Sequence, residues 1–129
     1  MAWQKAKLLA VEVYRATESF PRTEIYGLTT QMRRAAVSIP SNIAEGQGRL
    51  TPGEFRHFLG QARGSLLELQ TQIEIACDLG YLTAECAARL DEQAAEVVRI
   101  TNGLCESLIR NTPPTRPARN LKLETRNSQ

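Results

Sequence analysis

Aromatic side chains are scarce in this sequence, and long hydrophobic runs are missing. Phe, Trp and Tyr make up 5% of the 129 residues, so base recognition by stacking on several rings is not expected. No run approaches the roughly 18 apolar residues that a membrane-spanning helix needs. Near the N-terminus, Glu12 and Arg15 interrupt the only apolar segment that could resemble a signal-peptide core. The sequence therefore predicts neither a membrane span nor a secretory signal.

Cysteine and histidine are also too few to suggest a disulfide framework or a metal site. The cysteines are Cys77, Cys86 and Cys105, an odd number without a C-x-x-C pair. This pattern predicts reduced thiols and a cytoplasmic location. The single histidine, His57, has no His or Cys three or four residues away, as a zinc site on one helix would need. We therefore expect no metal and no cofactor.

Residues that often carry catalysis have simpler explanations here. Ser38 and Ser41 flank Pro40, which lacks a backbone donor, and nearby hydroxyl groups can satisfy backbone groups that such a proline leaves free. Glu68 and Glu74 lie on different faces of their predicted helix, so they do not form a carboxylate pair. The sequence predicts a protein that is not an enzyme.

Apolar residues recur at spacings of three and four in four segments, which is the pattern of amphipathic helices. The first helix is predicted from Ala2 to Phe20, the second from Leu28 to Gly46–Gly48, the third from Pro52 to Gly80, and the fourth from Thr83 through a seam that reaches Leu108. Because the connections are short, neighbouring helices should be antiparallel. The sequence predicts an all-α, up-down antiparallel four-helix bundle over residues 1–110.

The helix boundaries carry recognisable signals. Thr51 can cap the third helix, with Pro52 in its first turn and Glu54 completing a capping box. Gly80 suits the C-terminal end of that helix, and Thr83 can cap the fourth. Residues 111–129 contain three prolines and little apolar content, so they are predicted to form a basic, disordered tail.

Two of the predicted helices carry a second set of small and apolar residues on the side away from the core. These residues are Val37, Pro40 and Ala44 on the second helix, and Gly60, Gly64, Leu67, Thr71 and Ile75 on the third. Glycine inside a helix costs about 1 kcal/mol relative to alanine, so a pair of glycines one turn apart needs a compensating contact. We expect both strips to pack against neighbouring subunits. The alternative is that they flank the core of a distorted monomer.

The positive charge is concentrated in the first part of the chain and in the tail. Residues 1–50 contain seven Lys or Arg and four acidic residues, and residues 111–129 contain four and one. Arginine can donate two hydrogen bonds to a phosphate. The candidate phosphate-binding residues are Arg33, Arg34, Arg49, Arg56, Arg63, Arg116, Arg119, Lys122 and Arg126. The alternative is a solvated face with ordinary ion pairs to Glu45 or Glu74.

Two stretches resemble a known bacterial family. They are FPRTEIYGLTTQMRRAAVSIPSNIAEGQGR, residues 20–49, and FLGQARGSLLELQTQIEIACDLGYL, residues 58–82. These stretches resemble the four-helix-bundle proteins named for intervening sequences of 23S ribosomal RNA genes, and the resemblance covers roughly residues 3–110. It implies a homopentameric ring. It also implies kinship with the accessory variability proteins of diversity-generating retroelements, which bind nucleic acid and a reverse transcriptase.

Together, the residues and the resemblance support two functions. The leading hypothesis is a non-enzymatic, ring-forming accessory protein that contacts the phosphates of RNA or DNA through its arginines. Such binding should be directed at the nucleic-acid backbone and depend steeply on salt. The alternative is an oligomeric scaffold for a protein partner, for example a reverse transcriptase, without nucleic-acid binding of its own.

Overall fold

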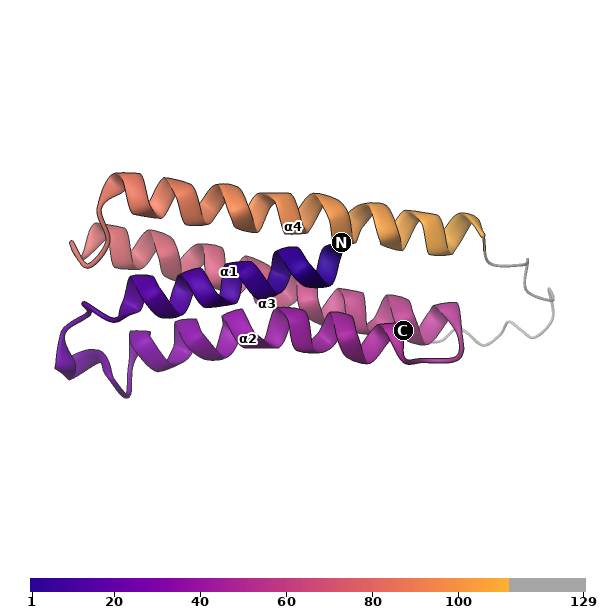
Figure 1. Cartoon of the computed structure of the whole chain (residues 1–129), viewed down its shortest axis with the longest axis horizontal. Helices are drawn as coiled ribbons and strands as arrows, with labels where there is room; N and C mark the ends of the chain where they lie inside the picture. The colour runs from indigo at the N-terminus through magenta and orange to yellow at the C-terminus, as the bar shows by residue number, and fades with distance from the viewer. Residues whose placement is uncertain (112–129) are drawn as a thin grey trace, which may run out of the picture.

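The computed structural model describes residues 1–111, which form four long helices and one short 3-10 turn (Figure 1). The elements are α1 (Ala2–Thr17), η1 (Arg22–Glu24), α2 (Leu28–Gln47), α3 (Pro52–Asp78) and α4 (Ala84–Arg110). These residues contain no β-strand. The all-α prediction is therefore confirmed for the described part of the chain.

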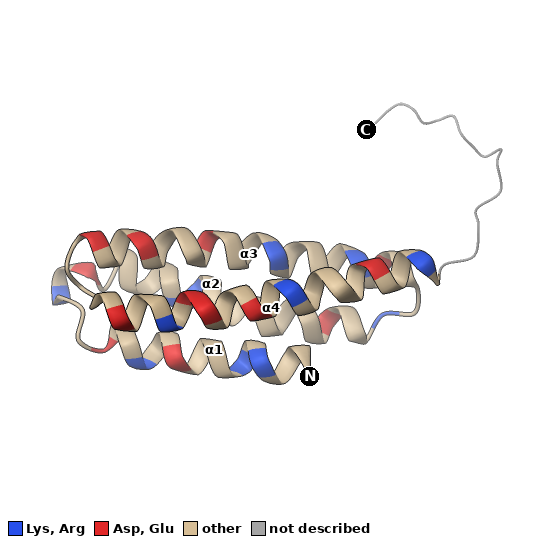
Figure 2. Ribbon diagram, turned by 90° about the horizontal axis from the view of Figure 1, so that it is seen from above, with Lys and Arg blue, Asp and Glu red and all other residues tan. Residues whose placement is uncertain are grey.

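The helices pack as an up-down bundle. Each helix contacts two neighbours: α1 and α3 both pack against α2 and α4, whereas α1 does not contact α3 and α2 does not contact α4. Viewed from above, α4 accordingly lies between α1 and α3 (Figure 2). Successive helices run in opposite directions, as the short connections predict (Figure 1).

Local hydrogen bonds explain where α3 and α4 begin and where α3 ends. The backbone N–H of Glu54 donates to Oγ1 of Thr51 over 3.1 Å, and the N–H of Cys86 donates to Oγ1 of Thr83 over 3.1 Å. Gly80 has a φ of 81°, a left-handed conformation that only glycine adopts without strain. The next N–H, that of Tyr81, returns to the Ala76 carbonyl over 2.9 Å. These three boundary predictions are confirmed.

Helix α1 ends at Thr17, earlier than the predicted end at Phe20. The Thr17 hydroxyl donates to the carbonyl of Val13 over 2.9 Å, and the chain then turns before Pro21. Phe20 is nevertheless buried, with its ring 5.2 Å from that of Tyr81. Apolar periodicity therefore placed Phe20 correctly in the core, although the residue lies in a turn rather than in the helix.

One carboxylate joins the start of α2 to the α3–α4 turn. Glu24 Oε1 accepts a hydrogen bond from the Leu28 N–H over 3.0 Å, and Glu24 Oε2 accepts one from the Tyr81 hydroxyl over 2.9 Å. The hydrogen bond to Glu24, with desolvation of the phenol, raises the pKa of Tyr81. Glu24 therefore fixes the start of α2 against the opposite hairpin.

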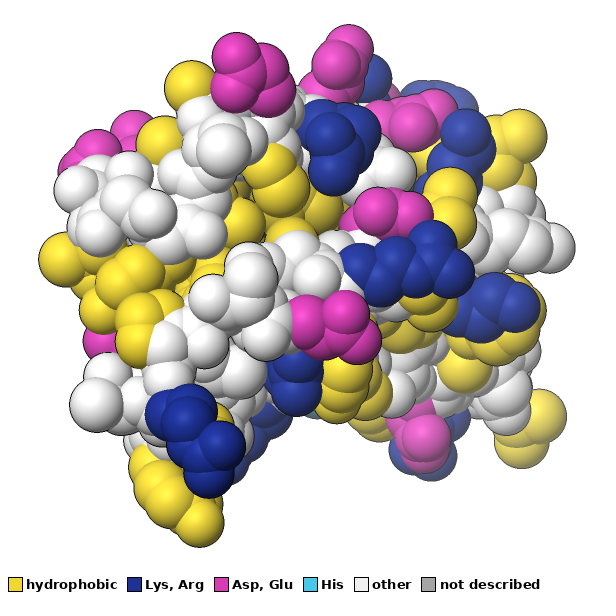
Figure 3. All heavy atoms as spheres, turned by 60° about the vertical axis from the view of Figure 1, so that its left-hand side comes forward, with side chains coloured by type: hydrophobic (Ala, Val, Ile, Leu, Met, Phe, Trp, Pro, Cys, Tyr) yellow, Lys and Arg dark blue, Asp and Glu magenta, His cyan; other side chains and the backbone are white. Residues whose placement is uncertain are grey.

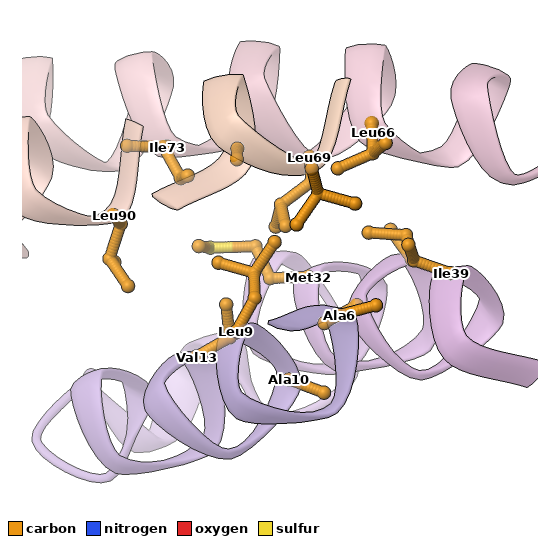
Figure 4. Packing of buried hydrophobic residues seen from close by; sticks show 14 of the residues in the cluster. Ala6, Leu9, Ala10, Val13, Met32, Ile39, Leu66, Leu69, Ile73 and Leu90 are labelled. Atoms are coloured by element: carbon orange, nitrogen blue, oxygen red, sulfur yellow. The ribbon is translucent and has the colours of Figure 1, made fainter. Parts of the chain in front are cut away.

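The core is almost entirely aliphatic. Side chains from all four helices meet along the bundle axis, including Leu9, Met32, Leu69 and Leu90, and none of these four has solvent-exposed surface (Figure 4). Burying one such side chain stabilises the fold by about 1.5–3 kcal/mol. Packing of this kind, rather than any single polar contact, holds the helices in place.

Helix α2 continues through Pro40. Just before the proline, the Ser38 hydroxyl lies 2.8 Å from the Ser65 hydroxyl of α3, and the Asn42 side-chain amide donates to the Ser38 carbonyl over 2.8 Å. This polar cluster links α2 to α3 at mid-length. Within residues 1–111, no helix is long and apolar enough to cross a membrane. Apart from Asn111, the predicted tail lies outside the described residues.

Candidate nucleic-acid interface

The two adjacent arginines of α2 have different surroundings. Arg33 lies against α1: its Nε donates to Oγ1 of Thr17 over 2.8 Å, and its Nη2 donates to the Tyr14 carbonyl over 3.2 Å. Its guanidinium group also stacks 4.6 Å from the centre of the Tyr14 ring. Arg34 is exposed and forms no ion pair within residues 1–111. Of the two, Arg34 is thus the one whose guanidinium is available to a ligand.

Arg49 is the first arginine of a group around the α2–α3 connection. Its Nη2 lies 2.6 Å from Oε2 of Glu45, and its guanidinium stacks 4.7 Å from the centre of the Phe58 ring. The ion pair with Glu45 is the alternative that the sequence suggested for these arginines. Arg49, Glu54, His57 and Phe58 line a shallow hollow beside the first turn of α3.

Arg56 and Arg63 lie on one edge of α3, two turns apart. Arg56 is partly buried, and its Nε is shielded from solvent without a hydrogen-bond partner among residues 1–111. A Cβ placed on Gly53 would lie 3.8 Å from Nη2 of Arg56, so this guanidinium lies beside the start of the helix. Arg63 is exposed and forms no ion pair within the same residues.

Antiparallel packing brings two further arginines to the same end of the bundle. Arg99 and Arg110 lie in the C-terminal half of α4, which runs beside the N-terminal half of α3 (Figure 2). Arg110 pairs weakly with Glu106, with a nitrogen–oxygen distance of 4.0 Å. The sequence alone did not single out these two residues, because only the packing of the bundle places their helix beside α3. The name arginine end is used below for Arg49, Arg56, Arg63, Arg99 and Arg110. Of these, Arg99 lies near the middle of α4 and shares a hollow with Glu92 and Glu96.

The opposite end of α3 and α4 is acidic. Residues 65–97 contain one arginine and seven Asp or Glu, and red segments outnumber blue ones along this part of both ribbons in Figure 2. Asp91 shows the effect: desolvation and the nearby Glu74 carboxylate both raise its pKa. A polyanion would therefore be attracted to one end of the bundle and repelled from the other.

The remaining predicted phosphate ligands are dispersed or lie outside the described residues. Arg33 and Arg34 belong to the other half of α2, away from the arginine end. Arg116, Arg119, Lys122 and Arg126 fall within residues 112–129, which the structure does not describe. Of the nine predicted residues, Arg49, Arg56 and Arg63 lie on the α2–α3 connection and the N-terminal half of α3.

The predicted second strips are exposed at most of their positions. Val37, Leu67 and Ile75 are 42%, 52% and 45% exposed. Ala44, Gly60, Gly64 and Thr71 are also exposed, and a Cβ added to either glycine would meet nothing within 4 Å. The fold of a single chain therefore gives no packing reason for glycine at Gly60 or Gly64.

Pro40 does not belong to this exposed strip. It is buried within the single chain. Its position three residues beyond Val37 suggested a shared outer face, but the helix turns Pro40 further toward α1, the side on which Arg33 makes its contacts. Pro40 was predicted to contact a neighbouring subunit together with Val37 and Ala44, whereas within one chain it is already buried.

The other polar candidates form no recognisable site in residues 1–111. The three cysteines are free and partly buried. His57 is exposed, with its ring edge-on to that of Phe58 at 5.2 Å. No group of three or more His, Cys, Asp or Glu side chains is placed to hold a metal ion within this part of the chain.

Comparison with known proteins gives two similarities. Residues 1–103 match the family model described as 23S rRNA-intervening sequence protein. A crystal structure from Bacteroides thetaiotaomicron VPI-5482, of a protein with unknown function from the S23 ribosomal protein family, shares 18% sequence identity with a TM-score of 0.75. The alignment covers 82% of this chain and 99% of that chain, and at this identity it supports the fold alone. No curated protein matches the sequence.

Proposed function

Because this chain belongs to the 23S rRNA-intervening sequence protein family, we propose that it is a non-enzymatic, homo-oligomeric accessory protein that binds RNA or DNA through phosphate contacts. The observation that carries the proposal is the arginine end, in which arginines from the α2–α3 connection, the N-terminal half of α3 and the C-terminal half of α4 belong to the same half of the bundle. Arginine forks suit phosphate oxygens, and their clustering sets the orientation of a bound backbone.

Assembly would strengthen this weak patch. Acidic residues lie among the arginines: Glu45 and Glu106 pair with Arg49 and Arg110, Glu54 lines a hollow with Arg49, and Glu92 and Glu96 line one with Arg99. One copy therefore carries little net charge in this region. A symmetric oligomer presents the same patch several times to one polyanion, and each additional contact then forms at a high effective concentration. The family resemblance suggests five copies. The exposed Val37, Leu67 and Ile75 supply apolar surface for such contacts.

The test is a gel-shift titration of the full chain against a structured RNA and a DNA duplex at about 50 and 200 mM salt. Binding should weaken steeply with salt, because each neutralised phosphate releases counterions. Replacing Arg56→Glu together with Arg63→Glu should abolish most of it. The matched control is Arg15→Glu with Arg22→Glu, which makes the same change of charge at exposed positions on α1 and the connection after it.

Three outcomes are informative. Loss of nucleic-acid binding in the Arg56/Arg63 variant but not in the control supports the arginine end as the binding site. Equal loss in both variants contradicts that location and indicates attraction by net charge alone. No binding by the unmodified protein at low salt rejects nucleic-acid binding and favours the protein-scaffold alternative, for which a reverse transcriptase is the first partner to test.

A further inference from the structure

The two hairpins of the bundle carry opposite formal charges. Residues 1–51, which form α1 and α2, contain seven Lys or Arg and four acidic residues, a net +3. Residues 52–111, which form α3 and α4, contain five and nine, a net −4. Since α1 packs beside α2 and α3 beside α4, the two charges lie on opposite sides of the molecule. Two copies would repel each other with like sides facing and attract with unlike sides facing.

The positive side also has exposed apolar surface. We define the α1–α2 face as Lys7, Val11, Tyr14, Arg33 and Val37. Val11, Tyr14 and Val37 are 39%, 43% and 42% exposed. The contacts of Arg33 with α1 place it at the junction of the two helices, and Val37 follows one turn later on α2. Figure 3, in which the left-hand side of Figure 1 comes forward, shows basic side chains beside hydrophobic ones on the surface.

The cations of this face are held in fixed positions. Arg33 is fixed by Thr17 and by the carbonyl and ring of Tyr14. The Lys7 ammonium lies 4.9 Å from the centre of the Trp3 ring. Side chains that are already ordered lose less conformational entropy when a partner arrives. The α1–α2 face therefore presents exposed apolar side chains together with two positively charged groups.

The negative side, formed by α3 and α4, also has exposed apolar surface, and it carries acidic groups. We define the α3–α4 face as Gly60, Leu67, Thr71, Glu74 and Asp91. The last four of these, with Gln70, line a groove between α3 and α4, and Leu67 is 52% exposed. Neither Glu74 nor Asp91 has a cationic partner in an ion pair within residues 1–111. Desolvation, together with repulsion by the Glu74 carboxylate, raises the pKa of Asp91. A neighbouring cation would relieve that repulsion.

Gly60 extends this face towards the start of α3. It precedes Leu67 by seven residues and so lies on the same edge of the helix. No atom of the chain lies within 4 Å of a Cβ built there. A glycine in mid-helix is unfavourable in an isolated copy. A second helix could approach the backbone closely at this point, and an apolar residue such as Val37 would fit the space.

We propose that the α1–α2 face of one copy docks on the α3–α4 face of the next copy, head to tail. The inference rests on the homo-oligomer of the proposed function. It specifies that neighbouring copies touch through two different faces of opposite charge, and not through two copies of the same face. Every copy then uses both faces. Such a heterologous contact closes into a ring when the rotation between copies permits it.

The test uses two variants of the full chain, each disabling one face. The first is Val11→Asp with Val37→Asp, and the second is Gly60→Gln with Leu67→Asp. All four positions are exposed, so the helices should still form, which circular dichroism can verify. The matched control, Gln31→Asp with Gln61→Asp, adds the same two charges as the first variant, and one more than the second, at exposed positions outside both faces. Masses are measured by analytical ultracentrifugation, separately and after mixing.

Head-to-tail docking makes a specific prediction for the mixture. Each variant alone should be monomeric, because every contact in its ring would contain a disabled face. An equimolar mixture should form a heterodimer of twice the monomer mass, since the intact α1–α2 face of one variant meets the intact α3–α4 face of the other. The control should keep the mass of the unmodified protein.

The proposal is overturned if either variant keeps the unmodified mass, or if two monomeric variants do not associate on mixing. Variants that each stop at a homodimer would indicate contacts between like faces and would also overturn it. An unmodified protein that is monomeric at micromolar concentration removes the assembly itself. Nucleic-acid binding is measured separately in the gel shift, so a failure of the docking model is distinguishable from a failure of the phosphate-binding site.

Discussion

At the scale of single residues, the adjacent Arg33 and Arg34 have identical side chains but different contacts, because one is partly buried and the other is exposed. Arg33 makes two hydrogen bonds and a ring contact to α1, whereas Arg34 points into solvent. Such contacts stabilise the α1–α2 pairing, since a hydrogen bond from a charged donor is worth about 1.5–3 kcal/mol and a cation–π contact about 0.5–1 kcal/mol.

We therefore expect Arg33→Ala to lower the free energy of unfolding by about 2 kcal/mol. Arg34→Ala, the neighbouring control, should change it by less than about 0.5 kcal/mol. Urea denaturation followed by circular dichroism measures both, under dilute conditions in which the copies are dissociated. Similar losses in the two variants would show that Arg33 has no special structural role.

Residue types at helix ends could be predicted well from sequence, but side-chain partners could not. Thr51, Gly80 and Thr83 act locally, through hydrogen bonds or backbone conformations that span a few residues. The contact of Arg33 with Thr17 spans sixteen residues along the chain and depends on how α1 and α2 cross. The burial of Pro40 was misjudged for the same reason, since periodicity does not define where the edge of a neighbouring helix lies.

At the scale of helices, the glycines fall into two groups with opposite physical roles. Gly46 is buried where α2 meets α3, and a Cβ there would lie 2.8 Å from Cδ1 of Phe55 and 3.0 Å from Cβ of Phe58. Gly60 and Gly103 are exposed, and a Cβ at either would meet nothing within 4 Å. The first glycine is required by the contact between helices, whereas the other two make no contact within a single chain and weaken their helices in an isolated copy.

Alanine substitutions should separate these roles. Gly46→Ala should lower the free energy of unfolding by about 1–2 kcal/mol, because overpacking outweighs the gain in helix propensity. Gly103→Ala, the control, should raise it by up to about 1 kcal/mol, and Gly60→Ala should do the same in a dissociated sample. Thermal or urea unfolding provides the values. A stabilising Gly46→Ala would mean that Phe55 and Phe58 move aside freely.

Helix order and the four-helix fold followed from short connections and an unbroken apolar spacing. The arginine end did not, because Arg99 and Arg110 are more than thirty residues from Arg63 and meet its side of the bundle only when α4 runs back along α3. Sequence reasoning found the charges of each helix but not the face on which charges from two helices combine.

At the scale of the whole molecule, the separation of charge between the hairpins has a measurable consequence for assembly. Raising the salt concentration from about 0.1 M to 1 M shortens the Debye length from about 10 Å to 3 Å. The association of copies through oppositely charged faces should weaken by about tenfold over that range, as measured by sedimentation. Association that strengthens with salt would instead indicate a contact dominated by apolar surface.

The shortness of α1 determines which part of the bundle should exchange its backbone amide hydrogens first. Helix α1 has 16 residues, whereas α3 and α4 have 27 each. The ion pair of Lys5 with Glu96 puts the start of α1 level with the middle of α4. The last turns of α4 therefore extend past the start of α1 and have no α1 beside them. Their backbone amides should exchange with deuterated solvent earliest. Since Arg110 lies there, a bound polyanion would reveal itself by slowing that exchange, at the least protected end of the bundle.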